Sequence, residues 1–249
     1  MNQLTALSRW LGEEHRGLAL LGEGNLSARS GPDRMLVKAS GTSLSQASFV
    51  EVRIRPLLDL LDAPTADDSD VQQALLDSRV DPSAPQPSVE SLLHAVALTH
   101  AGASVVAHCH PQSVNAVVCS DRASALIDGA LFPDQIVVLG REQLLLPYVD
   151  PGLELGRRSR GAILDYIRRL GERPRVIYLG NHGLVALGDS CDEARRITLM
   201  ADKTARILRD CLAIGTPQYL PQHLADRIHT RPDEQLRRSA LAGELPSDH

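Results

Sequence analysis

The feature that most constrains the fold is a short β-branched run, Ser104 to His110, that ends in two histidines. A helix-like segment precedes it, with apolar residues on one face, and we expect Ser88 to cap its start and Gly102 to end it. The β-branched run predicts a strand. Since side chains on a strand alternate between the two faces of a sheet, His108 and His110 are expected to point the same way.

Two imidazoles side by side on a strand can bind one metal ion such as zinc. Such pairs also occur without a metal, so a third ligand strengthens the interpretation, and His182 is a candidate. It stands in Asn181-His182-Gly183, between two strand-like runs. Three neutral histidines leave a tetrahedral metal with one open position, the pattern of a catalytic site. We therefore predict a metal site at His108, His110 and His182.

Composition and charge narrow the class of protein. The 249 residues are 43% hydrophobic, enough for one large α/β domain or two small ones. No apolar run is long enough to span a membrane. The formal net charge is −5 and there is no basic cluster, which argues against nucleic acid as a partner. We expect a small-molecule partner, with no nucleic acid and no membrane.

The four cysteines show no close pairing and suit a reducing compartment: Cys109, Cys119, Cys191 and Cys211. Charged residues, from Arg9 to Arg16, interrupt the apolar residues near the N-terminus, so a signal-peptide pattern is not expected. The sequence therefore predicts a cytoplasmic protein. Strand alternation turns Cys109 away from its two histidine neighbours, which predicts a buried apolar thiol.

Two glycine-containing loops are candidate anion sites. In Gly22–Ser27, glycine allows a positive φ and a close backbone approach to a ligand, although the alternative is an ordinary turn. Ser40-Gly41-Thr42 follows a strand-like run that ends at Lys38, the lysine nearest to these loops. Its N–H groups can bind an anion, and the loop can equally be the N-cap of the helical turn that follows.

The rest of the chain mixes helical and strand-like patterns. We predict a first helix with Leu4 on its apolar face and further helices over Pro111–Val118, Glu154–Leu170 and Asp192–Ile214. We also predict a strand running into a helix over Val50–Leu61, a surface loop over Asp62–Ser69, and a strand over Ile136–Leu139.

The chain contains five short motifs: Gly24-Asn25-Leu26-Ser27, Ser40-Gly41-Thr42, Pro87-Ser88-Val89-Glu90, His108-Cys109-His110 and Asn181-His182-Gly183. They occur in the order that the class II aldolase/adducin family shows, and through them the chain resembles that family. The family includes fuculose-phosphate and rhamnulose-phosphate aldolases and ribulose-phosphate 4-epimerases. The resemblance implies a three-layer α/β fold, with a central, mostly antiparallel sheet flanked by helices. It covers residues 1–215, leaves 216–249 as a C-terminal helical arm, and implies a homotetramer.

The resemblance also implies roles for single residues. The three histidines would bind a divalent metal, with zinc as the first choice and manganese or cobalt as alternatives. Glu90 would be the acid/base carboxylate beside the metal. The alternative is that Glu90 only caps the first turn of its helix, where a negative charge is favoured. The substrate phosphate would be bound by Gly24, Asn25, Ser40, Gly41 and Ser88.

The chain departs from the family pattern at two places. Val89 stands where the sugar-phosphate aldolases often have a second serine, so one phosphate-binding hydroxyl is missing. The segment Leu131–Gln135 has no tyrosine to match the family's catalytic one, which leaves Tyr219 as a candidate that would reach a neighbouring subunit. The context from Ser88 to His94 is similar to the aldolase portion of some bifunctional rhamnulose-phosphate enzymes.

The resemblance implies a metal-dependent aldolase of carbohydrate metabolism, a carbon–carbon lyase. It would cleave a ketose 1-phosphate or a related small sugar through an enediolate that zinc stabilises. Epimerisation, decarboxylation of a keto acid and dehydration of a ketose phosphate share this chemistry and stay open. From another class, an adducin-like structural module stays open too, although such a module need not retain all three histidines.

Overall fold

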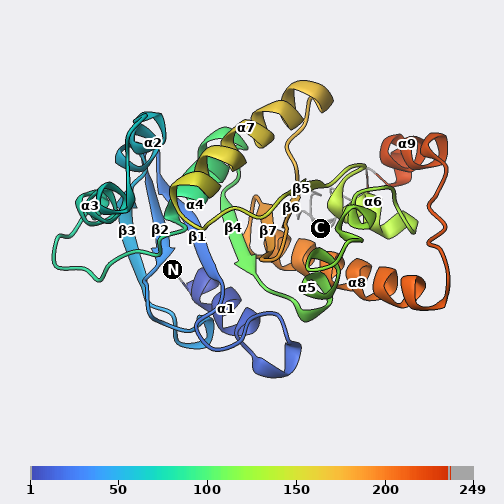
Figure 1. Ribbon diagram of the computed structural model, residues 1–249, viewed down its shortest axis with the longest axis horizontal. Helices are drawn as coiled ribbons and strands as arrows, with labels where there is room; N and C mark the ends of the chain where they lie inside the picture. Colours follow the sequence, from blue (N-terminus) through green and yellow to red (C-terminus); the bar gives the residue numbers. More distant parts are fainter. Residues whose placement is uncertain (1, 235, 237–249) are drawn as a thin grey trace, which may run out of the picture.

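The computed structural model describes residues 2–234 and residue 236, and its centre is a seven-stranded sheet (Figure 1). The strand order is β3-β2-β1-β4-β7-β6-β5. The strands are β1 (Asn25–Gly31), β2 (Arg34–Lys38), β3 (Phe49–Arg53), β4 (Val105–Cys109), β5 (Leu144–Leu146), β6 (Val176–Leu179) and β7 (Gly183–Gly188). Only β5 and β6 pair in parallel among these strands, so the predicted mostly antiparallel sheet is confirmed.

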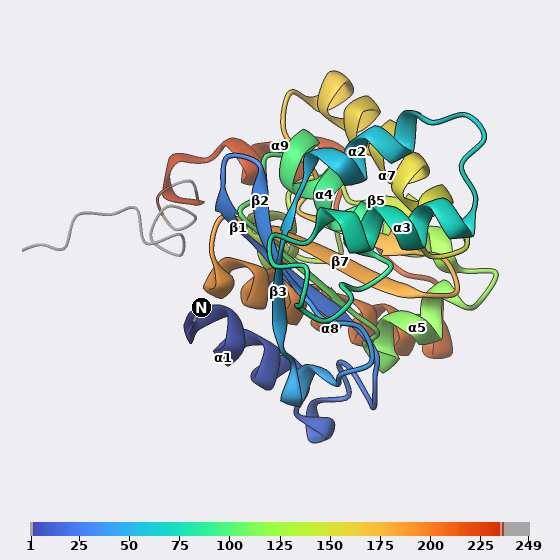
Figure 2. The same ribbon diagram turned by 90° about the vertical axis from the view of Figure 1, so that its left-hand side faces the viewer.

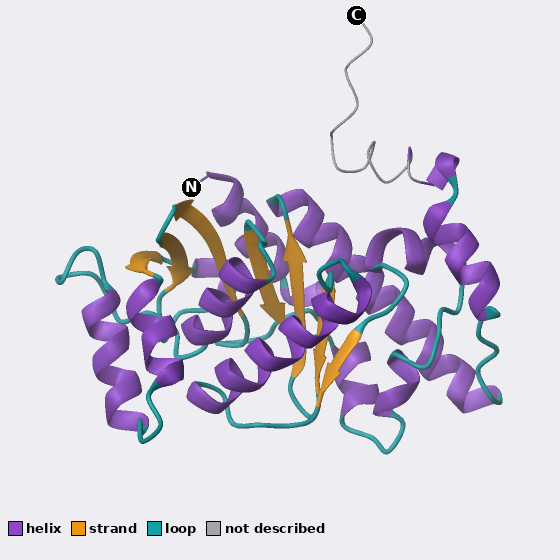
Figure 3. Ribbon diagram, turned by 90° about the horizontal axis from the view of Figure 1, so that it is seen from above, coloured by secondary structure: helices purple, strands orange, loops and turns teal. Residues whose placement is uncertain are grey.

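Helices cover both faces of the sheet, which confirms the predicted three layers (Figures 2 and 3). One face packs against α2 (Arg55–Asp62), α3 (Asp68–Ser78), α4 (Ser91–His100) and α7 (Leu153–Leu170). The other packs against α1 (Asn2–Leu11), α5 (Gln112–Val118), α6 (Pro133–Leu139) and α8 (Cys191–Ile214). Short 3-10 turns lie at Glu14–Arg16, Leu44–Gln46 and Ala123–Leu126.

Strand β4 lies in the middle of the sheet, and all of its residues are buried. Val106 contributes to the core beneath α4 and α7, whereas Ala107 and Cys109 contribute to the core on the α5 and α8 side. This alternation is the period of two that a strand imposes. The expected burial of Cys109 away from the histidines is therefore confirmed, and burial raises the pKa of its thiol.

The structure corrects the prediction of a strand over residues 136–139. These residues are the second half of α6, which starts with Pro133 in its first turn and ends at Gly140, where φ is +82°. Proline at a helix start and glycine just past its end are helix boundary signals. They outweigh the strand preference of the β-branched pair Val137-Val138 in this short helix.

Helix α3 is a second correction, because the predicted surface loop over Asp62–Ser69 runs into a helix that the sequence analysis did not identify. Asp67 caps this helix by accepting from the backbone N–H groups of Ser69 and Asp70, and Asp70 bonds back to the N–H of Asp67. This reciprocal capping box begins the helix inside a polar stretch.

After α8 the chain continues into α9 (Gln222–Thr230), whose Ala225 packs against Ile136 of α6. The division of the chain at residue 215 stays a prediction, and residues 235 and 237–249 of the expected arm lie outside the described residues. Within the described part of the chain, no helix is both long and apolar enough to cross a membrane. The homotetramer and the cytoplasmic location also stay predictions.

Candidate metal centre and active site

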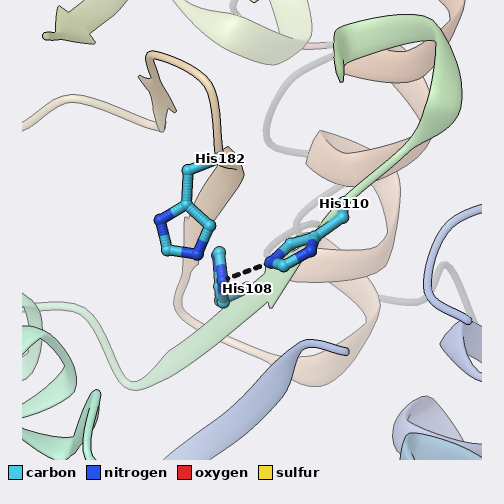
Figure 4. Close-up of side chains that lie close together, drawn as sticks. All are labelled: His108, His110 and His182. Carbon is cyan, nitrogen blue, oxygen red and sulfur yellow. Dashed lines mark hydrogen bonds between the residues drawn. The ribbon is translucent and has the colours of Figure 1, made fainter. Parts of the chain in front are cut away.

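Three histidine side chains converge at one end of the central strands (Figure 4). His108 lies on β4, His110 follows the end of that strand, and His182 lies in the turn between β6 and β7. One ring nitrogen from each lies within 4.8 Å of the other two. The structure thus brings together all three residues that the sequence predicts as metal ligands.

The backbone of the β6–β7 turn places His182 against the other two histidines. Antiparallel pairing sets Cys109 opposite Leu184, so the turn passes beside the end of β4. A Cβ on Gly183 would lie 2.5 Å from the carbonyl oxygen of Cys109 and 2.8 Å from Cδ2 of His110. Contacts that short do not occur, so only glycine lets the turn approach this closely.

The hydrogen bonds of His108 fix its tautomer. Its Nδ1 lies 2.9 Å from the carbonyl oxygen of Leu184, which can only accept, so Nδ1 carries the proton. In the neutral imidazole Nε2 then holds the lone pair, and it faces Nε2 of His110 at 2.9 Å. A backbone partner on the outer nitrogen is the usual arrangement around a histidine that binds metal through its inner nitrogen.

The remaining two imidazoles are neutral at pH 7. Burial, followed by the neighbouring His108 ring, lowers the pKa of His110 to about 3 and that of His182 to about 4. Neutral imidazole is the form that binds metal. In their neutral form the three imidazoles offer three ring nitrogens, a donor set that suits zinc and leaves room for a further ligand.

Glu90 lies against the histidine cluster on the side of α4 and is only 6% exposed. Its Oε2 is 3.3 Å from Nε2 of His108, and its Oε1 is 3.2 Å from Nε2 of His182. Burial by itself raises the pKa of Glu90, but His108, His182 and the Asn25 amide outweigh burial and lower it to about 2. The side chain is therefore an ionised carboxylate at neutral pH.

The contacts of Glu90 go beyond those of a helix cap. Helix α4 begins at Ser91, Glu90 occupies the capping position, and its side chain makes no capping hydrogen bond. The expectation that Ser88 caps the helix is wrong, because Glu90 occupies that position. Ser88 belongs to a turn before the helix, and in this turn the N–H of Ser91 donates to the carbonyl of Ser88. Ser88 Oγ instead accepts from the N–H of Glu90 at 3.3 Å.

Strand β1 contributes Asn25, which is 4% exposed and pairs with His108 across the ladder to β4. Its Nδ2 donates to Oε2 of Glu90 and lies 3.4 Å from Oγ of Ser88. Gly24 precedes it with a φ of +71°, and a Cβ there would be 2.7 Å from the carbonyl oxygen of His108. Gly24 thus shapes the entry of β1 into the site, as the sequence predicts for this loop.

The predicted phosphate loop lies next to the segment that leads to Glu90. The N–H of Ser40 donates to the carbonyl of Gln86 at 2.8 Å, and the N–H of Ser88 donates to that of Lys38 at 3.1 Å. Ser40 and Gly41 are both exposed. Because the N–H of Ser40 is occupied, an anion at this loop would be met by its hydroxyl and by the N–H of Gly41.

Lys38 is 4% exposed and lies close enough to Glu90 for that carboxylate to raise its pKa, although burial has the larger effect and lowers it. Within the part of the chain that the structure describes, no side chain accepts a hydrogen bond from its ammonium group. Tyr219 donates its hydroxyl to the carbonyl of Ala125 at 2.8 Å, and its expected reach into a neighbouring subunit stays a prediction.

The sequence analysis missed one polar residue, His94. It is fully buried, its Nδ1 lies 2.7 Å from Oγ of Ser27, and its Nε2 bonds to Oδ1 of Asn25. The signal that points to it is its spacing of four residues from Glu90, which places both on one face of the helix.

The chain is similar to several known proteins. The sequence model of the protein family described as "Class II Aldolase and Adducin N-terminal domain" matches residues 2–208. A 3,4-dihydroxyphthalate decarboxylase from Terrabacter sp. (strain DBF63) is 28% identical over 205 residues, covering 82% of this chain and 78% of that protein. The uncharacterized oxidoreductase YuxG from Bacillus subtilis (strain 168) is 23% identical over 226 residues. That match covers 85% of this chain, which spans only 28% of the length of YuxG.

A solved structure shows the same fold. The L-fuculose-1-phosphate aldolase from Thermus thermophilus superposes with a TM-score of 0.60 at 21% identity. The match covers 88% of this chain and 100% of the aldolase. Since the sequence model spans most of the chain and the fold agrees with it, this protein belongs to the class II aldolase and adducin N-terminal domain family.

Proposed function

We propose that this protein is a metal-dependent carbon–carbon lyase that cleaves a ketose 1-phosphate. The observation that carries this proposal is the contact between the buried Glu90 and the histidine cluster, with 3.3 Å to Nε2 of His108 and 3.2 Å to Nε2 of His182. A carboxylate beside a candidate metal site combines a proton acceptor with a position for a cation, which this cleavage needs.

The side chains of His108, His110 and His182 would hold the divalent cation, and zinc fits the three nitrogen donors best. Leu184 supports this fit, because its carbonyl fixes the tautomer that turns the Nε2 lone pair of His108 inward. When bound, the cation would polarise the substrate carbonyl and stabilise the negative charge that develops as the carbon–carbon bond breaks.

Glu90 would exchange the proton at the reacting carbon. In the direction of bond formation its ionised carboxylate removes a proton from the carbon next to the carbonyl. In the direction of cleavage the substrate hydroxyl that becomes the aldehyde loses its proton, and Glu90 delivers a proton to the reacting carbon. Its Oε1 is buried and accepts no hydrogen bond from the described residues, so this oxygen is available for the transfer.

An anionic substrate group would be met by Lys38, Ser40, Gly41 and Ser88, with Nδ2 of Asn25 3.4 Å from Oγ of Ser88. The buried ammonium of Lys38 supplies the positive charge, and the loop hydroxyls supply neutral donors. A phosphate monoester suits this combination. Val89, which is 42% exposed, offers no donor at the neighbouring position.

Decarboxylation is a second candidate. The relative from Terrabacter is a 3,4-dihydroxyphthalate decarboxylase, and the exposed apolar side chain of Val89 gives the region beside Glu90 a surface that suits an aromatic ring better than a phosphate. In this reaction two adjacent substrate hydroxyls would face the histidine cluster, and Lys38 would bind the carboxylate of the substrate. The three histidines with Glu90 argue against an adducin-like module without catalytic activity.

One screen separates the candidates. Purified protein with added zinc, manganese or cobalt is incubated with a panel of ketose 1-phosphates, and dihydroxyacetone phosphate is measured. Carbon dioxide release from dihydroxylated aromatic acids is measured in parallel. We expect metal-dependent release of dihydroxyacetone phosphate that a chelator abolishes. Release of carbon dioxide alone would replace the aldolase by a decarboxylase. The absence of both products would refute the lyase proposal.

A further inference from the structure

A chain of four polar side chains connects the sheet to Glu90 through the buried interface between β1 and α4. Asn25 and Ser27 share one face of β1 because they are two residues apart, and Glu90 and His94 are one helical turn apart. Ser27 and His94 are fully buried, and Asn25 is 4% exposed. The bonds run from Ser27 Oγ to His94 Nδ1, from His94 Nε2 to Asn25 Oδ1, and from Asn25 Nδ2 to Glu90 Oε2.

The direction of every hydrogen bond in this chain follows from its last member. Asn25 presents its NH₂ group to a carboxylate oxygen of Glu90 and its carbonyl oxygen, which only accepts, to His94. Nε2 of His94 must then carry the proton. Nδ1 is left as an acceptor, and the Ser27 hydroxyl donates to it at 2.7 Å.

A reversed Asn25 amide would place its oxygen against the carboxylate and its NH₂ group against a protonated nitrogen. Two acceptors would then face each other, as would two donors, in a buried interface. Leaving buried polar groups unpaired costs roughly 1–3 kcal/mol each. His94 in its Nε2–H form therefore holds the amide in one of its two orientations.

The two oxygens of Glu90 differ as a result. Oε2 accepts from Asn25, while Oε1 has no hydrogen-bond donor among the described residues and lies 3.2 Å from Nε2 of His182. We propose that His94 is a positioning residue that orients Asn25, so that Asn25 engages Oε2 of Glu90 and leaves Oε1 for proton exchange with the substrate. The inference rests on the proposed function in one respect, that Glu90 exchanges a proton.

Two amide variants test this role. In His94→Gln the side-chain NH₂ reaches the place of Nε2 and can donate to Asn25. In His94→Asn the shorter amide reaches only the place of Nδ1, beside Ser27. We expect kcat to fall roughly 10–100-fold in His94→Asn, the range seen when a supporting partner of a metal site is lost, and much less in His94→Gln. KM and bound metal should stay the same in both.

Melting temperature separates positioning from packing. If His94 only fills space, kcat of the two variants should follow their melting temperatures, and His94→Gln should not restore turnover. That result would overturn the proposal. Restoration by glutamine but not by asparagine, at similar melting temperatures, would support it.

A readout without substrate distinguishes failure of this inference from failure of the proposed function. Nitrogen NMR of protein labelled with ¹⁵N-histidine reports which ring nitrogen of His94 is protonated, with His94→Gln to assign the signal. We expect Nε2–H. An Nδ1–H tautomer would overturn the positioning role even if the protein is an active lyase, and Nε2–H would support it even if the lyase screen gives no product.

Discussion

Asn25 on β1 and His108 on β4 are direct partners in the antiparallel ladder. The amide that donates to Glu90 and one of the candidate metal ligands therefore share a single position in the sheet, and their separation is set by strand pairing. Sites built on strands and helices are held more precisely than sites on loops. Glu90 and a candidate metal ligand are in this way fixed against the same rigid element.

Replacing His182 by alanine should remove most of the bound metal and the activity together. The two remaining imidazoles cannot complete a three-nitrogen site, and ligand count largely decides zinc affinity. Metal content per chain, measured by elemental mass spectrometry, checks this. The matched control is His223→Ala, which removes an exposed imidazole on α9 and should keep full metal content. Full occupancy in His182→Ala would contradict the assignment.

Replacing Glu90 by glutamine should lower kcat by roughly 10²–10⁴-fold, the range for loss of an acid/base group, while metal content and fold stay unchanged. The amide retains the shape of the side chain and cannot take up the proton. Steady-state kinetics with a ketose 1-phosphate measures the effect. Glu154→Gln, which only breaks an exposed ion pair with Arg158 on α7, is the control. Near-normal turnover in Glu90→Gln would assign the proton transfer elsewhere.

Metal-free protein should lose stability as pH falls from about 6.5 toward 3. Burial, together with the nearby His108 ring, lowers the pKa of His94 to about 3 although Glu90 opposes this. In the unfolded chain a histidine takes up its proton near pH 6.5. Between these values the unfolded state binds more protons, so stability is complete above pH 6.5 and decreases as pH falls.

Urea unfolding at several pH values measures this dependence. His94→Gln removes the titrating group, so its stability should depend less steeply on pH in the same window, whatever its absolute stability. Equal slopes in the two proteins would show that His94 does not contribute.

Replacing Val89 by serine should strengthen binding of a phosphate. The new hydroxyl stands beside Ser88, and one neutral hydrogen bond contributes about 0.5–1.5 kcal/mol, equivalent to a few-fold lower inhibition constant for inorganic phosphate. Lys38→Met should have the opposite effect, because it removes the buried positive charge next to the loop. If inorganic phosphate inhibits all three proteins equally, the anion binds elsewhere.

Local patterns in the sequence were sufficient for the features that depend on near neighbours. The alternation of His108 and Cys109 follows from the period of two of a single strand. The helix over residues 136–139 was missed because its residues favour strands and the deciding signals, Pro133 and Gly140, lie at its ends. Helix α3 was missed because a capping box, and not an apolar face, begins it.

The candidate site shows the same limit. Each of the five motifs is short and local, and it is the resemblance to the family that implies that their residues gather. The role of His94 could not be predicted in the same way, because its hydrogen-bond partners Asn25 and Ser27 lie 69 and 67 residues away in the sequence and reach it only through the packing of β1 on α4. Its partners are known only when the strand and the helix are placed together.

The three histidines come from β4, from the residue just past its end, and from the turn that joins β6 to β7. A folding intermediate that had paired only β1 to β4 would hold two imidazoles and lack the third. If the three histidines bind a metal, its tight uptake during refolding should therefore coincide with the docking of β7 on β4, so the metal would report on that step.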